Sequence, residues 1–242
     1  MIRAALDEPR QVVATKSSAS DFVTEVDRAA EELIVGRIRA ARPDDAILGE
    51  EGASVEGTSG YRWVIDPIDG TTNFIHRHTG FAVSIAVERA GETLAGVVLD
   101  VMQGELFSAV RGGGATRDGA PITISGATEL SSALVATGFS YDRELKRRQG
   151  AVIAGLLPQI GDIRRMGAAA VDLCSVACGR VDAYFERGLK PWDYAAGALI
   201  ATEAGAEVGS IEGGPAVPGS MIAAAPALFE ELRARIQSDA TP

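Results

Sequence analysis

Four short acidic stretches hold the residues whose types and spacing could do chemistry. They are Asp21-Phe22-Val23-Thr24-Glu25-Val26-Asp27, Gly49-Glu50-Glu51-Gly52, Asp66-Pro67-Ile68-Asp69-Gly70-Thr71-Thr72-Asn73-Phe74 and Pro191-Trp192-Asp193. A single acidic residue usually lies on the solvated surface, where it caps a helix or pairs with an arginine. Carboxylates that converge in one cleft instead supply the oxygen ligands that hard cations such as Mg²⁺ prefer. Convergence of the four stretches would therefore form a metal site.

The third stretch carries the strongest chemical signal. The apolar run Trp63-Val64-Ile65 leads directly into Asp66-Pro67-Ile68-Asp69, and the proline cannot continue a normal β-ladder. Gly70 permits a turn or the close approach of a ligand. Thr71 and Thr72 are expected to cap a following helix, whose free N–H groups bind phosphate oxygens. A strand, two carboxylates, a glycine and a helix start together predict a site for a metal and a phosphate.

Hydrophobic periodicity places the elements that must position these stretches. It predicts helices over 21–42, 143–157, 168–178, 195–204 and 227–236. It predicts strands over 46–48, 63–65, 134–137, 182–186 and 220–224, and an antiparallel set over 81–88, 94–101 and 105–110. Sheets followed by helices in both halves predict an α+β fold built in layers. The boundary between the halves is expected within 120–132.

Composition excludes several classes of function. The chain has 242 residues, of which 46% are hydrophobic, so it is long enough to bury a sizeable core. The net charge of −10 argues against non-specific binding to nucleic acid and against docking on an anionic membrane. No stretch approaches the ~18 apolar residues of a membrane span, and residues 1–13 do not form a signal peptide. We therefore expect a cytoplasmic protein.

The four stretches, in this order, resemble the motifs of the inositol monophosphatase family of Mg²⁺-dependent phosphatases. The fourth match extends through Trp192-Asp193-Tyr194-Ala195-Ala196-Gly197, and the resemblance covers nearly the whole chain from Lys16. It implies a layered αβαβα sandwich of the sugar and inositol phosphatase type. Residues 1–130 would carry most metal ligands and residues 131–242 would carry Asp193 and substrate contacts, the two parts forming one compact catalytic unit.

The resemblance implies roles for individual residues. Two or three Mg²⁺ ions would be held by Glu50, Asp66, the carbonyl of Ile68, Asp69 and Asp193. Thr71, held by Asp27, would orient a metal-bound water together with Glu50. That water would attack phosphorus in line, without a covalent intermediate. Lys16 lies where the family places a basic residue on a mobile loop near the metals.

Substrate contacts are also implied by the resemblance. They would come from Asp69, Gly70, Thr71, Gly167, Ala168, Ala169, Glu186 and Asp193. Ala168 stands where several relatives carry a hydroxyl, so one polar contact is expected to be missing. The alternative for Glu186 is a surface residue paired with Arg187 or Arg165. The basic residues of 143–148 could attract phosphates at the mouth of the cleft or form a solvated helix face.

These expectations define a leading function and its alternatives. The leading one is hydrolysis of inositol monophosphate by a Mg²⁺-dependent, lithium-sensitive phosphatase, which is expected to be a homodimer acting on a small phosphorylated polyol. A phosphatase of the same superfamily acting on histidinol phosphate, fructose 1,6-bisphosphate or a nucleotide bisphosphate shares the same ligand set. The alternative from another class is a non-catalytic regulator that binds RNA polymerase or RNA.

Overall fold

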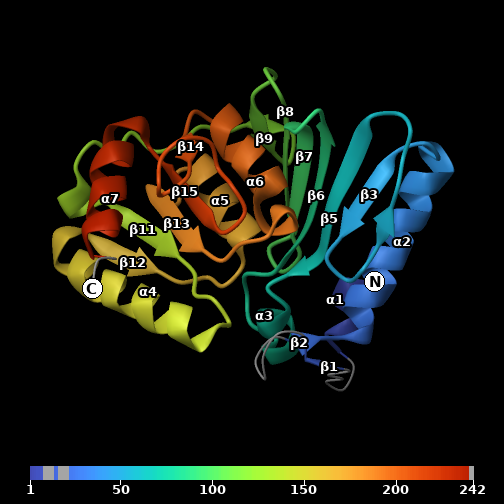
Figure 1. Cartoon of the computed structure of the whole chain (residues 1–242), viewed down its shortest axis with the longest axis horizontal. Helices are drawn as coiled ribbons and strands as arrows, with labels where there is room; N and C mark the ends of the chain where they lie inside the picture. Colours follow the sequence, from blue (N-terminus) through green and yellow to red (C-terminus); the bar gives the residue numbers. More distant parts are fainter. Residues whose placement is uncertain (8–13, 16–21, 240–242) are drawn as a thin grey trace.

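The computed structural model of the chain describes residues 1–7, 14–15 and 22–239, and they form five layers (Figure 1). Two sheets stand face to face with helices between them, and further helices cover the outer face of each sheet. The layered α+β fold expected from the sequence is therefore confirmed. None of the helices in the described ranges is both long and apolar enough to traverse a lipid bilayer.

The larger sheet is mainly antiparallel and lies in the first half of the chain. Its strand order is β10-β9-β8-β7-β6-β5-β3-β4, and only β3 and β5 run parallel to each other. The strands are β3 (Ala46–Gly49), β4 (Ser54–Val55), β5 (Tyr61–Asp69), β6 (Ala82–Arg89), β7 (Glu92–Asp100), β8 (Glu105–Val110), β9 (Ala115–Arg117) and β10 (Ala120–Pro121). A separate antiparallel pair is formed by β1 (Ala14–Thr15) and β2 (Phe22–Val23).

The smaller sheet belongs to the second half and has mixed direction. In its order β12-β11-β13-β15-β14, β11 runs parallel to both of its neighbours and β15 runs antiparallel to both of its own. The strands are β11 (Leu134–Thr137), β12 (Asp162–Arg164), β13 (Ala183–Arg187), β14 (Glu207–Gly209) and β15 (Ser220–Ala224). Every residue of β15 is buried, as expected for a strand covered by helices on both faces.

The described helices form the other three layers. They are α1 (Ile2–Ala5), α2 (Glu25–Ala41), α3 (Thr71–His76), α4 (Arg143–Leu156), α5 (Ala169–Ala177), α6 (Pro191–Glu203) and α7 (Pro226–Asp239). Helix α2 packs on the outer face of the larger sheet, α5 and α6 lie between the sheets, and α4 and α7 cover the smaller sheet (Figure 1). The fully buried α5 consists mainly of small residues, which lets it fit between two sheets.

Glycine brings the central helices close to their neighbours. A Cβ on Gly96 of β7 would stand 2.8 Å from Cα of Ala196 in α6. On the other side of α6, a Cβ on Gly197 would stand 2.8 Å from Cβ of Leu173 in α5. The layers therefore meet at backbone contact distance, and the core shared by the two halves has little room for added atoms.

The structure corrects the expected bounds of three elements. Helix α2 begins at Glu25 rather than residue 21, because Thr24 and Asp27 form a reciprocal cap there; Asp21 lies outside the described residues. Helix α6 begins at Pro191 rather than 195, because the Lys190 N–H donates to the Asp193 carboxylate and caps the earlier start. The strand of residues 63–65 continues to Asp69 as β5. The remaining helices match their expected ranges within a few residues.

We predict that Gly96→Ala lowers the free energy of unfolding by about 1–3 kcal/mol, the usual cost of adding a methyl group to a packed core. The added Cβ would meet the backbone of α6, which cannot move aside alone. Gly36→Ala in α2 is the matched control, because nothing lies within 4 Å of its Cβ position. Urea denaturation should show the control equal to or more stable than the parent. Equal stability of Gly96→Ala and the control would contradict this packing.

Candidate active site

An irregularity in β5 delivers the central carboxylates to one edge of the larger sheet. Asp66 pairs with Ser84 and Asp69 pairs with Ala82, so three steps along β5 oppose two along β6. The extra residue falls at the Pro67–Ile68 segment, where proline has no N–H to give to a ladder. The Asp66 carboxylate accepts the Ile68 N–H at 3.0 Å, which fixes the bulge from within.

Gly70 ends β5 and caps α3, which corrects the expectation that Thr71 and Thr72 are the caps. Gly70 has φ of 89°, in the left-handed region, and both threonines already belong to the helix. A Cβ at this position would lie 2.9 Å from the Gly80 carbonyl oxygen. A side chain is therefore disfavoured both by this close contact and by the left-handed backbone conformation. The turn therefore requires glycine, and the Thr71 hydroxyl serves another purpose.

Thr71 is tied to α2 through Asp27. The Thr71 hydroxyl donates to Oδ1 of Asp27 at 3.0 Å and also lies 3.1 Å from the Ile68 carbonyl oxygen. Asp27 is fully buried, and its other oxygen accepts the N–H and hydroxyl of Thr24 in the helix cap. The cap of α2 thus orients a hydroxyl that lies 44 residues further along the chain.

The second half contributes the N-termini of its two central helices. At the start of α6, Oδ2 of Asp193 accepts the Lys190 N–H at 2.6 Å, which holds this carboxylate at the end of the helix. At the start of α5, the Ala170 N–H donates to Oδ2 of Asp69 at 2.7 Å, a bond between the two halves of the chain. Backbone donors in the second half therefore hold carboxylates from both halves.

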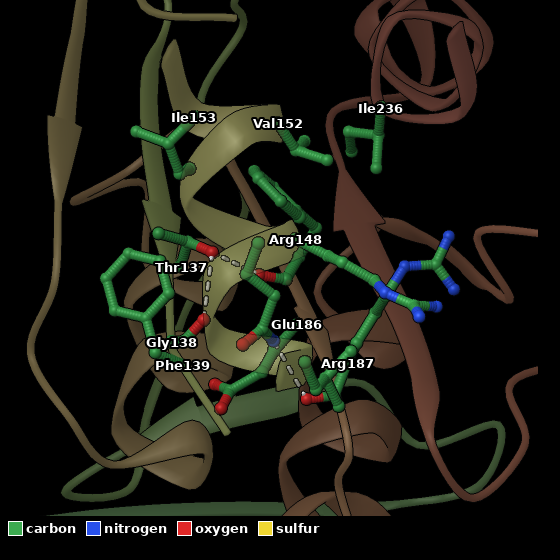
Figure 2. Close-up of a pocket in the computed structure, with 12 residues that line it drawn as sticks. Thr137, Gly138, Phe139, Arg148, Val152, Ile153, Glu186, Arg187 and Ile236 are labelled. Atoms are coloured by element: carbon green, nitrogen blue, oxygen red, sulfur yellow. Dashed lines mark hydrogen bonds between the residues drawn. The ribbon is translucent and has the colours of Figure 1, made fainter. Parts of the chain in front are cut away.

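Glu186 lies near the end of β13 and is half-buried, and of its two expected partners Arg165 is close enough to act on its charge. Its Oε2 accepts the hydroxyl of the buried Tyr184 at 2.7 Å, while Arg187 pairs with Glu212 instead. Figure 2 shows the Glu186 carboxylate beside Gly138, where a Cβ would overlap it. Glu186 also lines a separate cavity of about 200 Å³, whose apolar lining comes mainly from α4 and includes Val152 and Ile153 (Figure 2).

These elements enclose an acidic cleft of about 420 Å³ between the halves. The predicted site residues that line it are Glu50, Asp66, Ile68, Asp69, Gly70, Thr71, Gly167, Ala169, Glu186 and Asp193. Ala168 does not line it, because its side chain is buried beneath Gly70. Lys16 lies outside the described residues. The basic residues of α4 do not line the cleft either, and Arg147 and Arg148 pair with Glu144.

Sequence reasoning missed two supporting side chains. The Asn73 amide donates to the carbonyl oxygens of Gly80 and Met166, at 2.6 and 2.7 Å, and so joins the segments on either side of the cleft. Tyr184 holds Glu186 as described above. Asn73 stands inside the third acidic stretch, so its position was a usable signal, whereas Tyr184 is an ordinary aromatic residue of a buried strand.

Burial and mutual repulsion dominate the electrostatics of the cleft. Burial raises the pKa of Asp66 well above its usual range, and the negative charges of Glu50, Asp69 and Asp193 raise it further. Burial likewise raises the pKa of Asp69 to about 7, although the Ala170 N–H opposes the shift. Burial raises the pKa of Glu186 to about 7 against the opposing bond from Tyr184. Carboxyl groups with raised pKa values ionise readily only when a positive charge lies beside them.

The donor set suits a hard cation. Carboxylate oxygens from two sheets and a helix N-terminus face the same cleft, together with the segment that carries the Ile68 carbonyl, and oxygen ligands are what Mg²⁺ prefers. Within the described residues, however, no three His, Cys, Asp or Glu side chains stand in an arrangement that could hold a metal ion as they are. Binding of a cation therefore has to draw the carboxylates together against their repulsion.

Comparisons with known proteins agree with this arrangement. The chain matches the model of the inositol monophosphatase family over residues 1–241. It is 45% identical over 237 residues to the inositol-1-monophosphatase SuhB of Mycobacterium tuberculosis, covering 93% of this chain and 81% of that protein. It is 43% identical over 241 residues to the Nus factor SuhB of Escherichia coli, covering 96% and 89%.

A solved structure extends the match to three dimensions. The extragenic suppressor protein SuhB of Bartonella henselae superposes with a TM-score of 0.92 at 34% identity, covering 98% of this chain and 92% of that one. The layered fold is therefore that of the solved inositol monophosphatase structures. The chain belongs to the inositol monophosphatase family, whose members are generally metal-dependent.

We predict that the metal-free protein loses stability as the pH rises from about 5 to about 8. The pKa values of Asp69 and Glu186 are held at about 7 in the folded protein, above the ~4 of an unfolded chain. Ionisation across this interval therefore favours the unfolded chain. Thermal denaturation in EDTA should show a falling Tm, and Mg²⁺ should reduce the fall. A level or rising Tm in EDTA would contradict this electrostatic picture.

Proposed function

We propose that the protein hydrolyses inositol monophosphate to inositol and phosphate. The observation that carries the proposal is the acidic cleft itself, where carboxylates from both halves lie beside the Gly70 turn with Glu186 among its walls. Family membership supports phosphatase chemistry, and the name of the 45% identical mycobacterial relative supports inositol monophosphate as the substrate. Glu186 supports a polyol, because a carboxylate accepts hydrogen bonds from two hydroxyl groups.

Mg²⁺ is the cofactor that the donor set fits. Two or three ions would be held by Glu50, Asp66, the carbonyl of Ile68, Asp69 and Asp193. Bound Mg²⁺ would neutralise phosphate charge, lower the pKa of water and stabilise the leaving oxygen. The raised pKa values of the cleft carboxylates are consistent with ligands that become fully ionised only beside a cation. Sensitivity to lithium follows from the family resemblance alone.

The residues around Gly70 would bind and orient the reactants. The backbone N–H groups of Gly70 and Thr71 would donate to phosphate oxygens. Because Thr71 donates its own hydroxyl hydrogen to Asp27, its oxygen is available to accept a hydrogen bond from the attacking water. Glu50 would accept the proton that this water loses. The water oxygen bonds to phosphorus as the ester P–O bond breaks, so no enzyme–phosphate bond forms.

The substrate would lie across the boundary between the halves. Gly167, Ala169 and Glu186 line the cleft on the side of the smaller sheet and would contact the inositol ring. Ala168 would support the Gly70 turn rather than touch the substrate, because its methyl group is buried. We further propose a cytoplasmic homodimer that acts on small phosphorylated polyols and binds neither nucleic acid nor membrane, in keeping with the net charge of −10.

A regulatory role is the second candidate function. One relative that is 43% identical to this chain over 241 residues is named a Nus factor rather than a phosphatase. Such a role could accompany catalysis or replace it, and the acidic composition favours a protein partner over RNA. Phosphate release separates the cases, because a regulator without catalytic activity would release no phosphate at any Mg²⁺ concentration.

Phosphate release from a substrate panel is the experiment that tests the proposed function. We expect Mg²⁺-dependent release from inositol 1-phosphate that EDTA abolishes. Histidinol phosphate, fructose 1,6-bisphosphate and an adenosine bisphosphate should be hydrolysed with lower kcat/KM. Faster release from one of these three compounds would reassign the substrate within the superfamily. A complete lack of release from all four would leave the regulatory role as the better account.

We predict that Asp66→Asn lowers kcat/KM by more than ~100-fold, a larger loss than removal of a group that only supports a ligand. The fold should remain, because asparagine has the shape of aspartate and its amide oxygen can still accept the Ile68 N–H. Asp45→Asn is the matched control: Asp45 is also buried, but it accepts from Ser59 and Trp63 at the opposite end of β5. Circular dichroism measures whether each variant keeps the fold, and kinetics at saturating Mg²⁺ measure its kcat/KM. Activity retained by Asp66→Asn would refute the ligand assignment.

A further inference from the structure

The turn that presents Glu50 to the acidic cleft is the short connection 49–53 between β3 and β4, which we call the Glu50 turn. One backbone bond closes this turn and a second ties it to β5. The Gly49 N–H donates to the Ala53 carbonyl oxygen at 2.7 Å, and the Glu50 N–H donates to the Ile65 carbonyl oxygen at 3.1 Å. Two more N–H groups of the turn, those of Glu51 and Ala53, point away from the sheet toward α2.

Glu31 of α2 receives both of these groups. The Glu51 N–H donates to its Oε2 and the Ala53 N–H to its Oε1, each at 2.9 Å. The side chain is 5% exposed, so the bonds are shielded from water. A carboxylate that accepts one backbone N–H on each oxygen forms charge-assisted bonds, which are stronger than neutral ones. The Glu31 carboxylate therefore holds the Glu50 turn through two hydrogen bonds on the side opposite the sheet.

Gly49 leaves the space in which this contact is made. A Cβ at Gly49 would overlap the Glu31 carboxylate, although the backbone there does not need the left-handed conformation. The glycine is thus required by the close approach of the carboxylate rather than by the turn itself. Helix α2 and the Glu50 turn pack closely here because residue 49 has no side chain.

We propose that Glu31 is a positioning residue for the cation site, acting through Glu50. Glu50 lines the cleft together with Asp66 and Asp69, so the position of the turn determines where its carboxylate stands. The two bonds to Glu31 hold the turn, and with it Glu50, at this edge of the cleft. This inference rests on the proposed function, in which Glu50 is a cation ligand.

Glu31→Gln is the variant that tests this proposal. It preserves the length of the side chain but replaces one oxygen with an NH₂ group, which leaves either Glu51 or Ala53 without an acceptor. Gly49→Ala disturbs the same contact from the other side. Glu32→Gln is the matched surface control on the next, exposed position of α2. Asp45→Asn controls for loss of a buried carboxylate that serves structure alone.

Two measurements separate positioning from general stability. A Mg²⁺ titration followed by thermal shift, without substrate, should give midpoints ~10-fold higher for Glu31→Gln and Gly49→Ala, the effect expected when a ligand loses its support. Both controls should keep the parent midpoint. Saturating Mg²⁺ should restore most of the phosphate release of Glu31→Gln. Hydrogen exchange at the Glu51 and Ala53 amides should be faster in Glu31→Gln and Gly49→Ala than in the parent, and unchanged in the two controls.

The outcomes distinguish this inference from the proposed function. An unchanged Mg²⁺ midpoint for Glu31→Gln, beside a normal response of the parent, would overturn the positioning role alone. Equal midpoint shifts in Glu31→Gln and Asp45→Asn would overturn it as well, because any destabilisation would then suffice. A parent protein that neither responds to Mg²⁺ nor releases phosphate would overturn the proposed function, and the cation-site role of Glu31 with it.

Discussion

Confinement of several carboxylates in one buried cleft is the constraint on which the structure depends. Asp66 and Asp69 are buried and Asp193 is half-buried beside them. Their negative charges repel one another, so each needs a fixed backbone donor or an added positive charge. The fold supplies the donors: the Ile68, Ala170 and Lys190 N–H groups each bind one of these side chains. The remaining negative charge is the basis on which we propose a cation in the cleft.

The layered architecture is the means by which these groups meet. Helices α5 and α6 lie between the two sheets, and their N-termini face the edge where β5 breaks its ladder. The bond from Ala170 to Asp69 and the bonds from Asn73 join the halves directly at the cleft. Close contacts at Gly96 and Gly197 bring the layers near enough for that junction. The site and the core are therefore parts of one packing arrangement.

The relatives of the chain carry two kinds of name, inositol-1-monophosphatase and Nus factor. The proposed phosphatase chemistry belongs to the cleft, where carboxylates from both halves of the chain lie together. A regulatory partner would instead meet the outer surface, on which the cleft geometry has no bearing. Both roles are compatible with one fold, because activity resides in the cleft while association depends on exposed side chains.

The sequence by itself identified the residues that could carry the chemistry, and most of them line one cleft in the structure. Asp66, Asp69 and Asp193 stand in short motifs that can be recognised locally. The apolar periodicities of α2, α4 and α7 indicated the layered fold, because a local pattern of apolar residues determines whether a segment forms a helix or a strand. The boundary near 130 stays a prediction. Tertiary structure decided the contacts that join distant segments. These are the Gly70 cap, the burial of Ala168 beneath it, and the hydrogen bond from the Glu51 N–H to Glu31, twenty positions earlier. Such contacts follow from how layers pack, and no local pattern encodes the distance between them.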